Sequence, residues 1–259
     1  MPFLIAFTFG AIVGSFLNVC IARLPKEESI VYPPSRCPSC RHPLLWHDNV
    51  PVLSFIFLKG RCRNCQGRIS IQYPAVEILT GVLFVLFYCQ YGLSLKGTLY
   101  LALALALIVQ AFIDWRYQII PDSITLPGIL AGLAASAFYP ELHAKSVWSQ
   151  GILWSIAGAL LGGGILLAMG TAASLVLKKE AMGGGDVKLF AMIGAFLGWK
   201  AVLWTLFLAS LAGTIIGLYF RLKRGQERLP FGPFIALGAV LYLFFGERFF
   251  AWYAGLIGF

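Results

Sequence analysis

The sequence predicts an all-α polytopic membrane protein with about eight transmembrane helices and a small cytoplasmic domain between helices 1 and 2. Of its 259 residues, 59% are hydrophobic and only 12% are charged, whereas a soluble domain carries about 25% charged residues. The apolar residues form runs that are long enough to cross a bilayer, which takes roughly 20 helical residues. Four cysteines in two close pairs, with many basic residues around them, separate the first two runs.

The first and sixth apolar runs need individual justification. Residues 2–20 have no basic segment before them and no clear small-residue cleavage site, so they predict a retained helix. The sixth run is short and follows three glycines, which predicts a half-helix that lines a cavity. The tail 249–259 is too short to span again, and we expect it to extend the last helix or to lie in the membrane interface. The predicted spans are 2–22, 74–92, 97–114, 123–139, 150–173, 186–199, 201–220 and 231–250.

Basic residues set the predicted orientation of these spans. Of 20 lysines and arginines, eight lie between Arg23 and Arg68 and four between Arg221 and Arg228. The positive-inside rule places both groups in the cytoplasm, so the N-terminus lies outside and eight spans return the C-terminus to the outside. Because topology already accounts for the net charge of +9, we expect lipid contact and no nucleic-acid partner.

The cysteine pairs predict a structural zinc site. Two CxxC motifs, 37–40 and 62–65, have 21 residues between them, and four thiolates satisfy tetrahedral zinc. The alternatives are two disulfides or four thiols without a metal, and the reducing cytoplasm argues against disulfides. A loop of about fifty residues is also too small for a large core, so a metal would help it fold. We therefore predict a small cytoplasmic zinc-binding domain at 23–73, between helices 1 and 2. Its ligands are Cys37, Cys40, Cys62 and Cys65.

Two aspartates lie where lipid tolerates charge poorly. Asp114 ends the third run and Asp186 opens the sixth. An ionisable group at membrane depth costs roughly 3 kcal/mol on insertion scales, so each marks a candidate functional site. The predicted topology places both at cytoplasmic ends of their spans. Two carboxylates that share one proton supply a general base and a general acid. The sequence therefore predicts that 74–259 is a transmembrane aspartyl protease core with Asp114 and Asp186 as its catalytic pair.

Two other acidic residues have weaker functional signals. Asp122 is the rival of Asp114, but it precedes a helix, where the helix dipole favours an acid. We predict a structural or substrate-positioning role for Asp122. Glu77 follows Pro74 at the start of the second span, which also suits an acid. A structural role and a functional role both remain open for Glu77.

The residues around Asp186 predict how its carboxylate is presented. Gly183 and Gly185 allow close backbone approaches that a Cβ would block, and this freedom would let a substrate backbone reach Asp186. The alternative is that these glycines only permit a bend. Lys188 either supports the site or extends its amine to the membrane interface.

The order of these motifs resembles that of the type IV prepilin peptidases, bifunctional leader peptidases and N-methyltransferases with a GxGD-type intramembrane aspartyl protease site. The resemblance covers nearly the whole chain. One departure is Arg116, which stands where many members carry an acid. The matching motifs are Gly14-Ser15-Phe16-Leu17-Asn18-Val19 with Arg23-Leu24-Pro25, both CxxC pairs, Asp48-Asn49-Val50-Pro51, Gly60-Arg61-Cys62, Tyr73-Pro74-Ala75-Val76-Glu77, Ile113-Asp114 with Ile120-Pro121-Asp122, Gly183-Gly184-Gly185-Asp186-Val187-Lys188 and Pro230-Phe231-Gly232-Pro233.

This resemblance implies a function. It implies that Asp114 and Asp186 cleave the short basic leader of prepilins and pseudopilins at the cytoplasmic face of the bacterial inner membrane. It also implies N-methylation of the new N-terminus with S-adenosylmethionine. For the methyl donor, Gly60 and the zinc domain are the candidate region, and a simple turn at Gly60 is the alternative.

Three other functions remain open at this stage. One is a peptidase without methyltransferase activity, and another is a membrane adaptor whose zinc module binds partners. The third is an ion-coupled transporter that uses the same aspartates as a relay. Transporters of this kind usually contain internal repeats with paired broken helices, and the sequence has no evident repeat.

Overall fold

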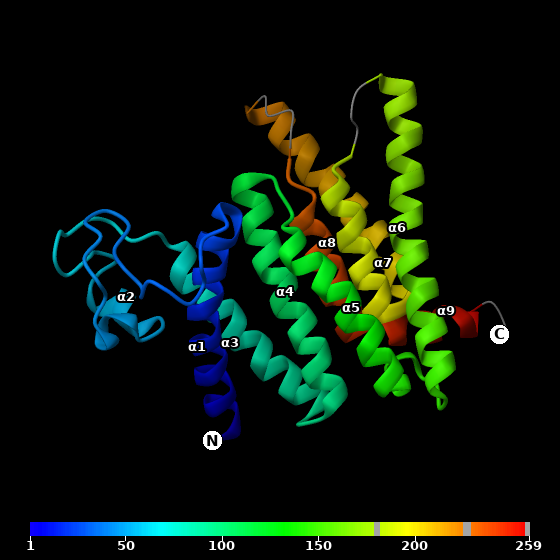
Figure 1. The fold of residues 1–259 in the computed structure, drawn as a ribbon, viewed down its shortest axis with the longest axis horizontal. Helices are drawn as coiled ribbons and strands as arrows, with labels where there is room; N and C mark the ends of the chain where they lie inside the picture. Colours follow the sequence, from blue (N-terminus) through cyan, green and yellow to red (C-terminus); the bar gives the residue numbers. More distant parts are fainter. Residues whose placement is uncertain (179–181, 225–228, 257–259) are drawn as a thin grey trace. The chain divides into compact units, whose positions relative to one another are not determined.

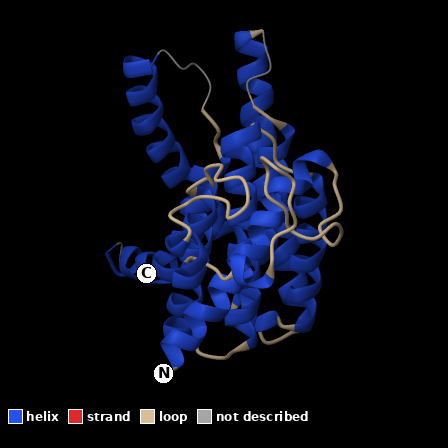
Figure 2. Cartoon of the chain, turned by 90° about the vertical axis from the view of Figure 1, so that its left-hand side faces the viewer, coloured by secondary structure: helices blue, strands red, loops and turns tan. Residues whose placement is uncertain are grey.

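The computed structural model describes residues 1–178, 182–224 and 229–256. Within these ranges the regular elements are helices, as predicted, and no strand is present (Figures 1 and 2). The chain divides into two compact units, 1–101 and 102–259. Part of the predicted basic group at 221–228 lies outside the described residues.

The α-helices are mostly apolar in composition, and the short α2 lies in the loop that follows α1. Figure 1 labels them. They are α1 (Pro2–Arg23), α2 (Leu53–Phe57), α3 (Gln72–Tyr91), α4 (Leu95–Tyr117), α5 (Asp122–Phe138), α6 (Trp148–Leu177), α7 (Gly184–Arg224), α8 (Gly232–Leu241) and α9 (Glu247–Leu256). A π-helical turn, Tyr242–Gly246, joins α8 to α9.

The number of helices that could cross a membrane differs from the prediction. Within the described residues, length and composition qualify six helices: α1, α3, α4, α6, α7, and α8 continued through α9. The apolar helix α5 has 17 residues and is shorter than these six. The predicted sixth and seventh spans both lie in α7, where the backbone is non-helical at Gly198, with φ 76° and ψ 179°. Only glycine adopts such a conformation readily, so α7 consists of two helical segments that meet at this residue.

In the first unit, α1 and α3 pack through small residues. A Cβ at Gly10 would lie 2.8 Å from the Cα of Gly81, and one at Gly14 would lie 2.7 Å from the Cα of Glu77. Small residues at helix interfaces allow this close approach in membranes. One turn beyond Gly14, the Nδ2 of Asn18 donates a hydrogen bond to the carbonyl oxygen of Tyr73, 3.0 Å away. The two helices are therefore antiparallel, and the end of α1 lies beside the start of α3.

The segment between α1 and α3 is mostly loop (Figure 2). Each CxxC motif lies in a tight turn closed by an isolated antiparallel bridge, Arg36 with Pro43 and Arg61 with Arg68. The guanidinium of Arg23 holds the start of the loop, because it donates to the carbonyl oxygens of Ser29 and Pro33 over 2.8 and 2.6 Å.

In the second unit, the first segment of α7 lies at the centre of the core. The backbones of α6 and α7 touch at Gly158 and Gly194, where a Cβ on either residue would overlap the other's carbonyl oxygen. The hydroxyl of Ser155 donates to the carbonyl oxygen of Ala195 over 2.6 Å. A Cβ at Gly132 of α5 would also lie 2.9 Å from the Cβ of Ala195. These contacts fix the position of the first segment of α7, whose first turn contains Asp186.

Candidate functional site

Asp114 is a buried carboxylate held at the start of α8. Its side chain lies near the end of α4 and the residue is 6% exposed. Oδ2 accepts a hydrogen bond from the backbone N–H of Gly232 over 2.7 Å, one of the amides that a helix start leaves without a helical partner. A Cβ at Gly232 would lie 2.7 Å from Oδ2. Only glycine therefore allows this approach, whereas the sequence marks Gly232 merely as part of a turn motif.

The structure brings Asp186 together with Asp114, although 71 residues separate them in sequence. Asp186 is half-buried in the first turn of α7. The two carboxylates are close enough for their charges to interact. Two like charges in a partly buried site favour a state with one proton between them. The arrangement can therefore supply a base and an acid to one bound substrate.

The glycines before Asp186 differ in their surroundings. A Cβ at Gly185 would lie 2.8 Å from the Cβ of Ile120, so this glycine lets the start of α7 approach the segment before α5. A Cβ at Gly183 would lie 3.7 Å from Oδ2 of Asp186, which is an ordinary contact distance. Gly185 therefore has a packing reason that the sequence did not reveal, while Gly183 leaves space beside the carboxylate.

Asp122 and Lys188 form an ion pair beside this site. Nζ of Lys188 lies 2.7 Å from both carboxylate oxygens of Asp122, and the two side chains are 38% and 53% exposed. The lysine two residues after Asp186 thus contacts the first residue of α5. Asp122 has a cationic partner of its own, which suits a structural or positioning role. An exposed pair of this kind contributes about 0–1 kcal/mol.

The four cysteines converge in the first unit. Their Sγ atoms all lie within 4.8 Å of one another, and those of Cys37 and Cys65 are 3.9 Å apart. Zinc–sulfur bonds of about 2.3 Å in a tetrahedron place sulfur atoms about 3.8 Å apart. All four cysteines are free thiols. Both the residue types and the spacing therefore fit a zinc ion, and the cluster is a candidate metal centre.

The thiols of the cluster perturb one another. A backbone hydrogen bond from His42 is the largest cause that lowers the pKa of Cys40 to about 6. At Cys65 a backbone hydrogen bond from Gly67 lowers the pKa, but hydrogen bonds with the other cysteines, together with desolvation, raise it to about 11. The cluster thus holds one thiol that ionises easily and one that resists ionisation. A divalent cation would stabilise all four thiolates together.

We expect one zinc ion per chain in the purified full-length protein. Replacing Cys37 with serine removes a buried ligand, so the variant should lose most of its bound zinc and unfold its loop at a lower temperature. Elemental analysis by mass spectrometry measures the metal. Cys89 lies outside the cluster, in α3, and Cys89→Ser should keep the full zinc content. A wild-type ratio near zero, with four reactive thiols, would show that the cluster is not a zinc site.

Gly60 shapes the loop beside the second CxxC turn. It has φ 68°, and its N–H donates to the carbonyl oxygen of Phe55 over 2.8 Å. A Cβ on Gly60 would lie 3.0 Å from Cζ of the Phe55 ring. The residue therefore meets both conditions that require glycine, a left-handed backbone and a close neighbour.

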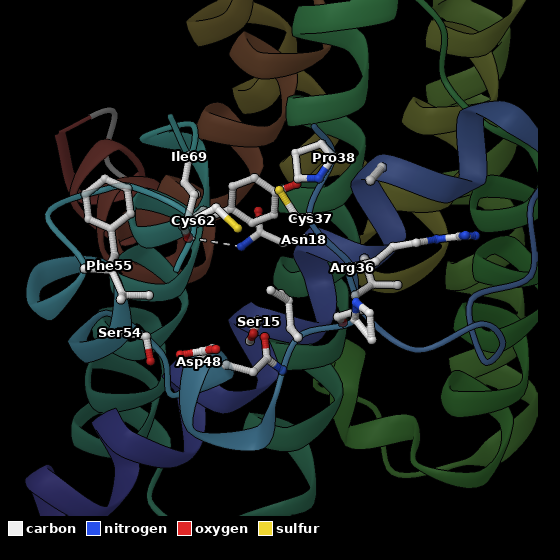
Figure 3. A pocket seen from close by; sticks show the side chains of 18 of the residues that line it. Ser15, Asn18, Arg36, Cys37, Pro38, Asp48, Ser54, Phe55, Cys62 and Ile69 are labelled. Carbon is white, nitrogen blue, oxygen red and sulfur yellow. Dashed lines mark hydrogen bonds between the residues drawn. The ribbon is translucent and has the colours of Figure 1, made fainter. Parts of the chain in front are cut away.

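A cavity of about 420 Å³ lies between α1, the cysteine-containing loop and α3 (Figure 3). Its lining includes Asn18 of α1, Phe55 of the loop and Glu77 of α3. Oε2 of Glu77 accepts a hydrogen bond from the backbone N–H of Val52 over 2.8 Å. Gly60 is not among the described residues that line the cavity, but its neighbour Phe55 is. In the sequence, Asn18 is marked only as part of a motif. The one sequence signal for a functional role is that Asn18 is a polar side chain within an apolar helix.

Known proteins match the chain along most of its length. The model of the bacterial peptidase A24 N-terminal domain matches residues 8–91, and that of the type IV leader peptidase family matches residues 101–218. No solved structure is significantly similar.

Curated relatives named prepilin leader peptidase/N-methyltransferase occur in several bacteria. One from Myxococcus xanthus is 41% identical over 85% of this chain, which spans 63% of that relative's length. Others from Aeromonas salmonicida and Pseudomonas putida are 34% and 33% identical, each over 98% of this chain and 94% of the relative. The resemblance seen in the sequence motifs is thereby confirmed, and the chain belongs to the type IV leader peptidase family.

Proposed function

We propose that this protein is an aspartic endopeptidase that removes the short basic leader from type IV prepilins and pseudopilins. It then methylates the new N-terminal amine with S-adenosylmethionine. The observation that carries the proposal is the meeting of Asp114 and Asp186, from α4 and α7, in one partly buried site. The names of the relatives, which combine both activities, support it.

The carboxylate pair performs the cleavage. One carboxylate takes a proton from water while the water oxygen bonds to the scissile carbonyl carbon, and the partner carboxyl gives its proton to the carbonyl oxygen. The N–H of Gly232 occupies Oδ2 of Asp114 and leaves Oδ1 for water. When the carbon–nitrogen bond breaks, the newly protonated carboxyl supplies the proton that the departing amine needs.

The proposed orientation places this site at the cytoplasmic face of the bacterial inner membrane. The loop after α1 is rich in lysine and arginine, which favours the cytoplasm. In this arrangement α5 and the two segments of α7 cross the membrane separately, for eight crossings in total. The proposed domains are helix 1 at 1–22, the zinc-binding domain at 23–73 and the protease core at 74–259.

The zinc-binding domain serves the second activity. Cys37, Cys40, Cys62 and Cys65 would hold zinc, which stabilises the loop and takes no part in bond making. S-adenosylmethionine supplies a methyl group on a sulfonium, which is open to attack by an amine. The protein must bind this donor, present the amine in its neutral form and exclude water.

The proposal is tested by incubating the purified protein with a full-length prepilin, with and without S-adenosylmethionine, and weighing the products. We expect loss of the leader in both reactions and addition of one methyl group only with the donor. Cleavage without methylation would leave a peptidase alone. An intact prepilin in both reactions would contradict the proposal.

Gly60→Val should impair methylation more than cleavage. Valine is strained at φ 68°, and its Cβ would press on the ring of Phe55, which lines the cavity. Gly92→Val is a matched control, because Gly92 has φ 59° but a Cβ added there would have no atom within 4 Å. Methylation rates on pre-cleaved pilin and cleavage rates on prepilin measure the two effects. Equal loss of both activities at Gly60 would contradict the expected selectivity.

A further inference from the structure

The cavity of the first unit has the size and the lining of a small-molecule site. Its volume of about 420 Å³ falls within the usual range for ligand pockets, about 300–1,000 Å³. Apolar side chains form much of its wall, among them Leu45, Phe55 and Ile69. Polar groups of α1 and α3 line it as well. Figure 3 shows the labelled side chains of this lining.

Asn18 has a buried oxygen without a partner. The residue is 2% exposed, and its Nδ2 donates to the carbonyl oxygens of Tyr73 and Gly14 over 3.0 and 3.3 Å. These bonds fix the orientation of the amide, and its Oδ1 accepts no hydrogen bond among the described residues. An unsatisfied buried acceptor costs about 1–3 kcal/mol. A residue that lines a cavity avoids this cost when a ligand donates to it.

Glu77 adds an acidic group to the same cavity. It is 7% exposed, and its carboxylate has hydrogen bonds with the Val52 backbone and the Ser15 side chain. Within the described part of the chain it forms no ion pair. Asp48, another acidic residue of the lining, is already paired with Arg63 over 2.8 Å. Among the acidic side chains of this lining, Glu77 is therefore the buried one that has no cationic partner within the described residues.

Asn18 and Glu77 lie at neighbouring levels of one helix pair. Asn18 bonds to Tyr73, which is one turn before Glu77 on α3, while Gly14, one turn before Asn18 on α1, touches the backbone of Glu77. The cavity thus combines an amide oxygen and a carboxylate from adjacent turns. This pair suits a primary ammonium group, which has three N–H donors and a positive charge.

We propose that this cavity binds the methyl donor S-adenosylmethionine, with Asn18 and Glu77 accepting hydrogen bonds from the donor's ammonium group. The proposal rests on the methyltransferase activity proposed above and gives it a location. The lining holds both acidic side chains, Glu77 among them, and basic ones, which suits a donor that carries cationic groups and a carboxylate. The adenine ring suits the apolar wall around Phe55. Gly60 then acts on methylation indirectly, through the position of Phe55.

The test measures binding of S-adenosylmethionine alone by calorimetry, with the full-length protein in detergent and no pilin present. The wild type should bind the donor, and Asn18→Leu and Glu77→Gln should each raise Kd roughly tenfold or more, because a bond to a charged group is lost or weakened. Gln110→Leu is the matched control. Gln110 also has a buried oxygen without a partner, but it lies in the second unit, so its Kd should equal that of the wild type.

Thermal unfolding without ligand identifies variants that fail to fold. If Asn18→Leu does not fold, the affinity of Glu77→Gln alone tests the proposal. Wild-type affinity in both folded variants would overturn the location and leave the methyltransferase proposal standing. An equal loss in Gln110→Leu would overturn it too, because the effect would not be local. A wild type that cleaves prepilin but binds no donor would overturn the methyltransferase activity itself. The N-terminus of a cleaved pilin is also an ammonium group. If the cavity binds that group instead of the methyl donor, both folded variants should bind S-adenosylmethionine with wild-type affinity.

Discussion

Asp114→Asn and Asp186→Asn should each abolish leader cleavage while the protein still inserts and folds. An amide cannot take a proton from water, so a pair with one carboxylate lacks either its base or its acid. The loss of one such group typically costs roughly 100- to 10,000-fold in rate. Asparagine at position 114 keeps an oxygen that can accept from the N–H of Gly232, so the contact between α4 and α8 should survive.

The measurement is the rate of leader removal from full-length prepilin, with thermal unfolding as the check on folding. Asp122→Asn is the matched control, because it removes the same charge from a neighbouring acidic residue. Its exposed pair with Lys188 contributes about 0–1 kcal/mol, so we expect activity to be retained. Substantial turnover by folded Asp114→Asn or Asp186→Asn would show that the substituted aspartate is not needed for cleavage. An inactive Asp122→Asn beside an active Asp114→Asn would show that the pair had been assigned wrongly.

Much of the fold follows from the apolar runs, which also predict a boundary between two spans near residue 200, whereas the particular residue at which α7 breaks depends on tertiary structure. Composition and run length predict the all-helical membrane class because lipid leaves the backbone few alternatives. Gly198 is one of many glycines in apolar segments, and nothing local marks it for φ 76°. In the folded chain a Cβ there would lie 3.4 Å from Nδ1 of His143, a neighbour far away in sequence.

The candidate site divides in the same way. The proximity of Asp114 and Asp186 agrees with the expected topology, which assigns both residues to one side of the membrane. Spacing likewise identified the four cysteines. Two other features could not be predicted, because they depend on which helices meet. One is the hydrogen bond from the N–H of Gly232 to Asp114, and the other is the unsatisfied oxygen of Asn18.

Asp114→Asn and Asp186→Asn should still methylate a pilin whose leader has already been removed. The carboxylates lie in the second unit, while every residue that lines the cavity lies between 15 and 77, in the first. The amine that receives the methyl group exists only after cleavage, so Asp186→Asn should give no methylated product from full-length prepilin. On pre-cleaved pilin its methylation rate should be close to that of the wild type. Mass spectrometry of both reactions measures this difference.

We expect the reverse defect when the cavity is altered and the two aspartates are kept. At a donor concentration near the wild-type Kd, Glu77→Gln should cleave prepilin and release mostly unmethylated pilin, because its substitution weakens donor binding in the cavity and leaves Asp114 and Asp186 in place. Mixing this variant with Asp186→Asn should restore methylated pilin from full-length prepilin, since one protein supplies the cleaved amine and the other the methyl group. If folded Asp186→Asn fails on pre-cleaved pilin, the aspartate also takes part in methyl transfer. The proposal that cleavage and methylation use separate residues in the two units would then be wrong.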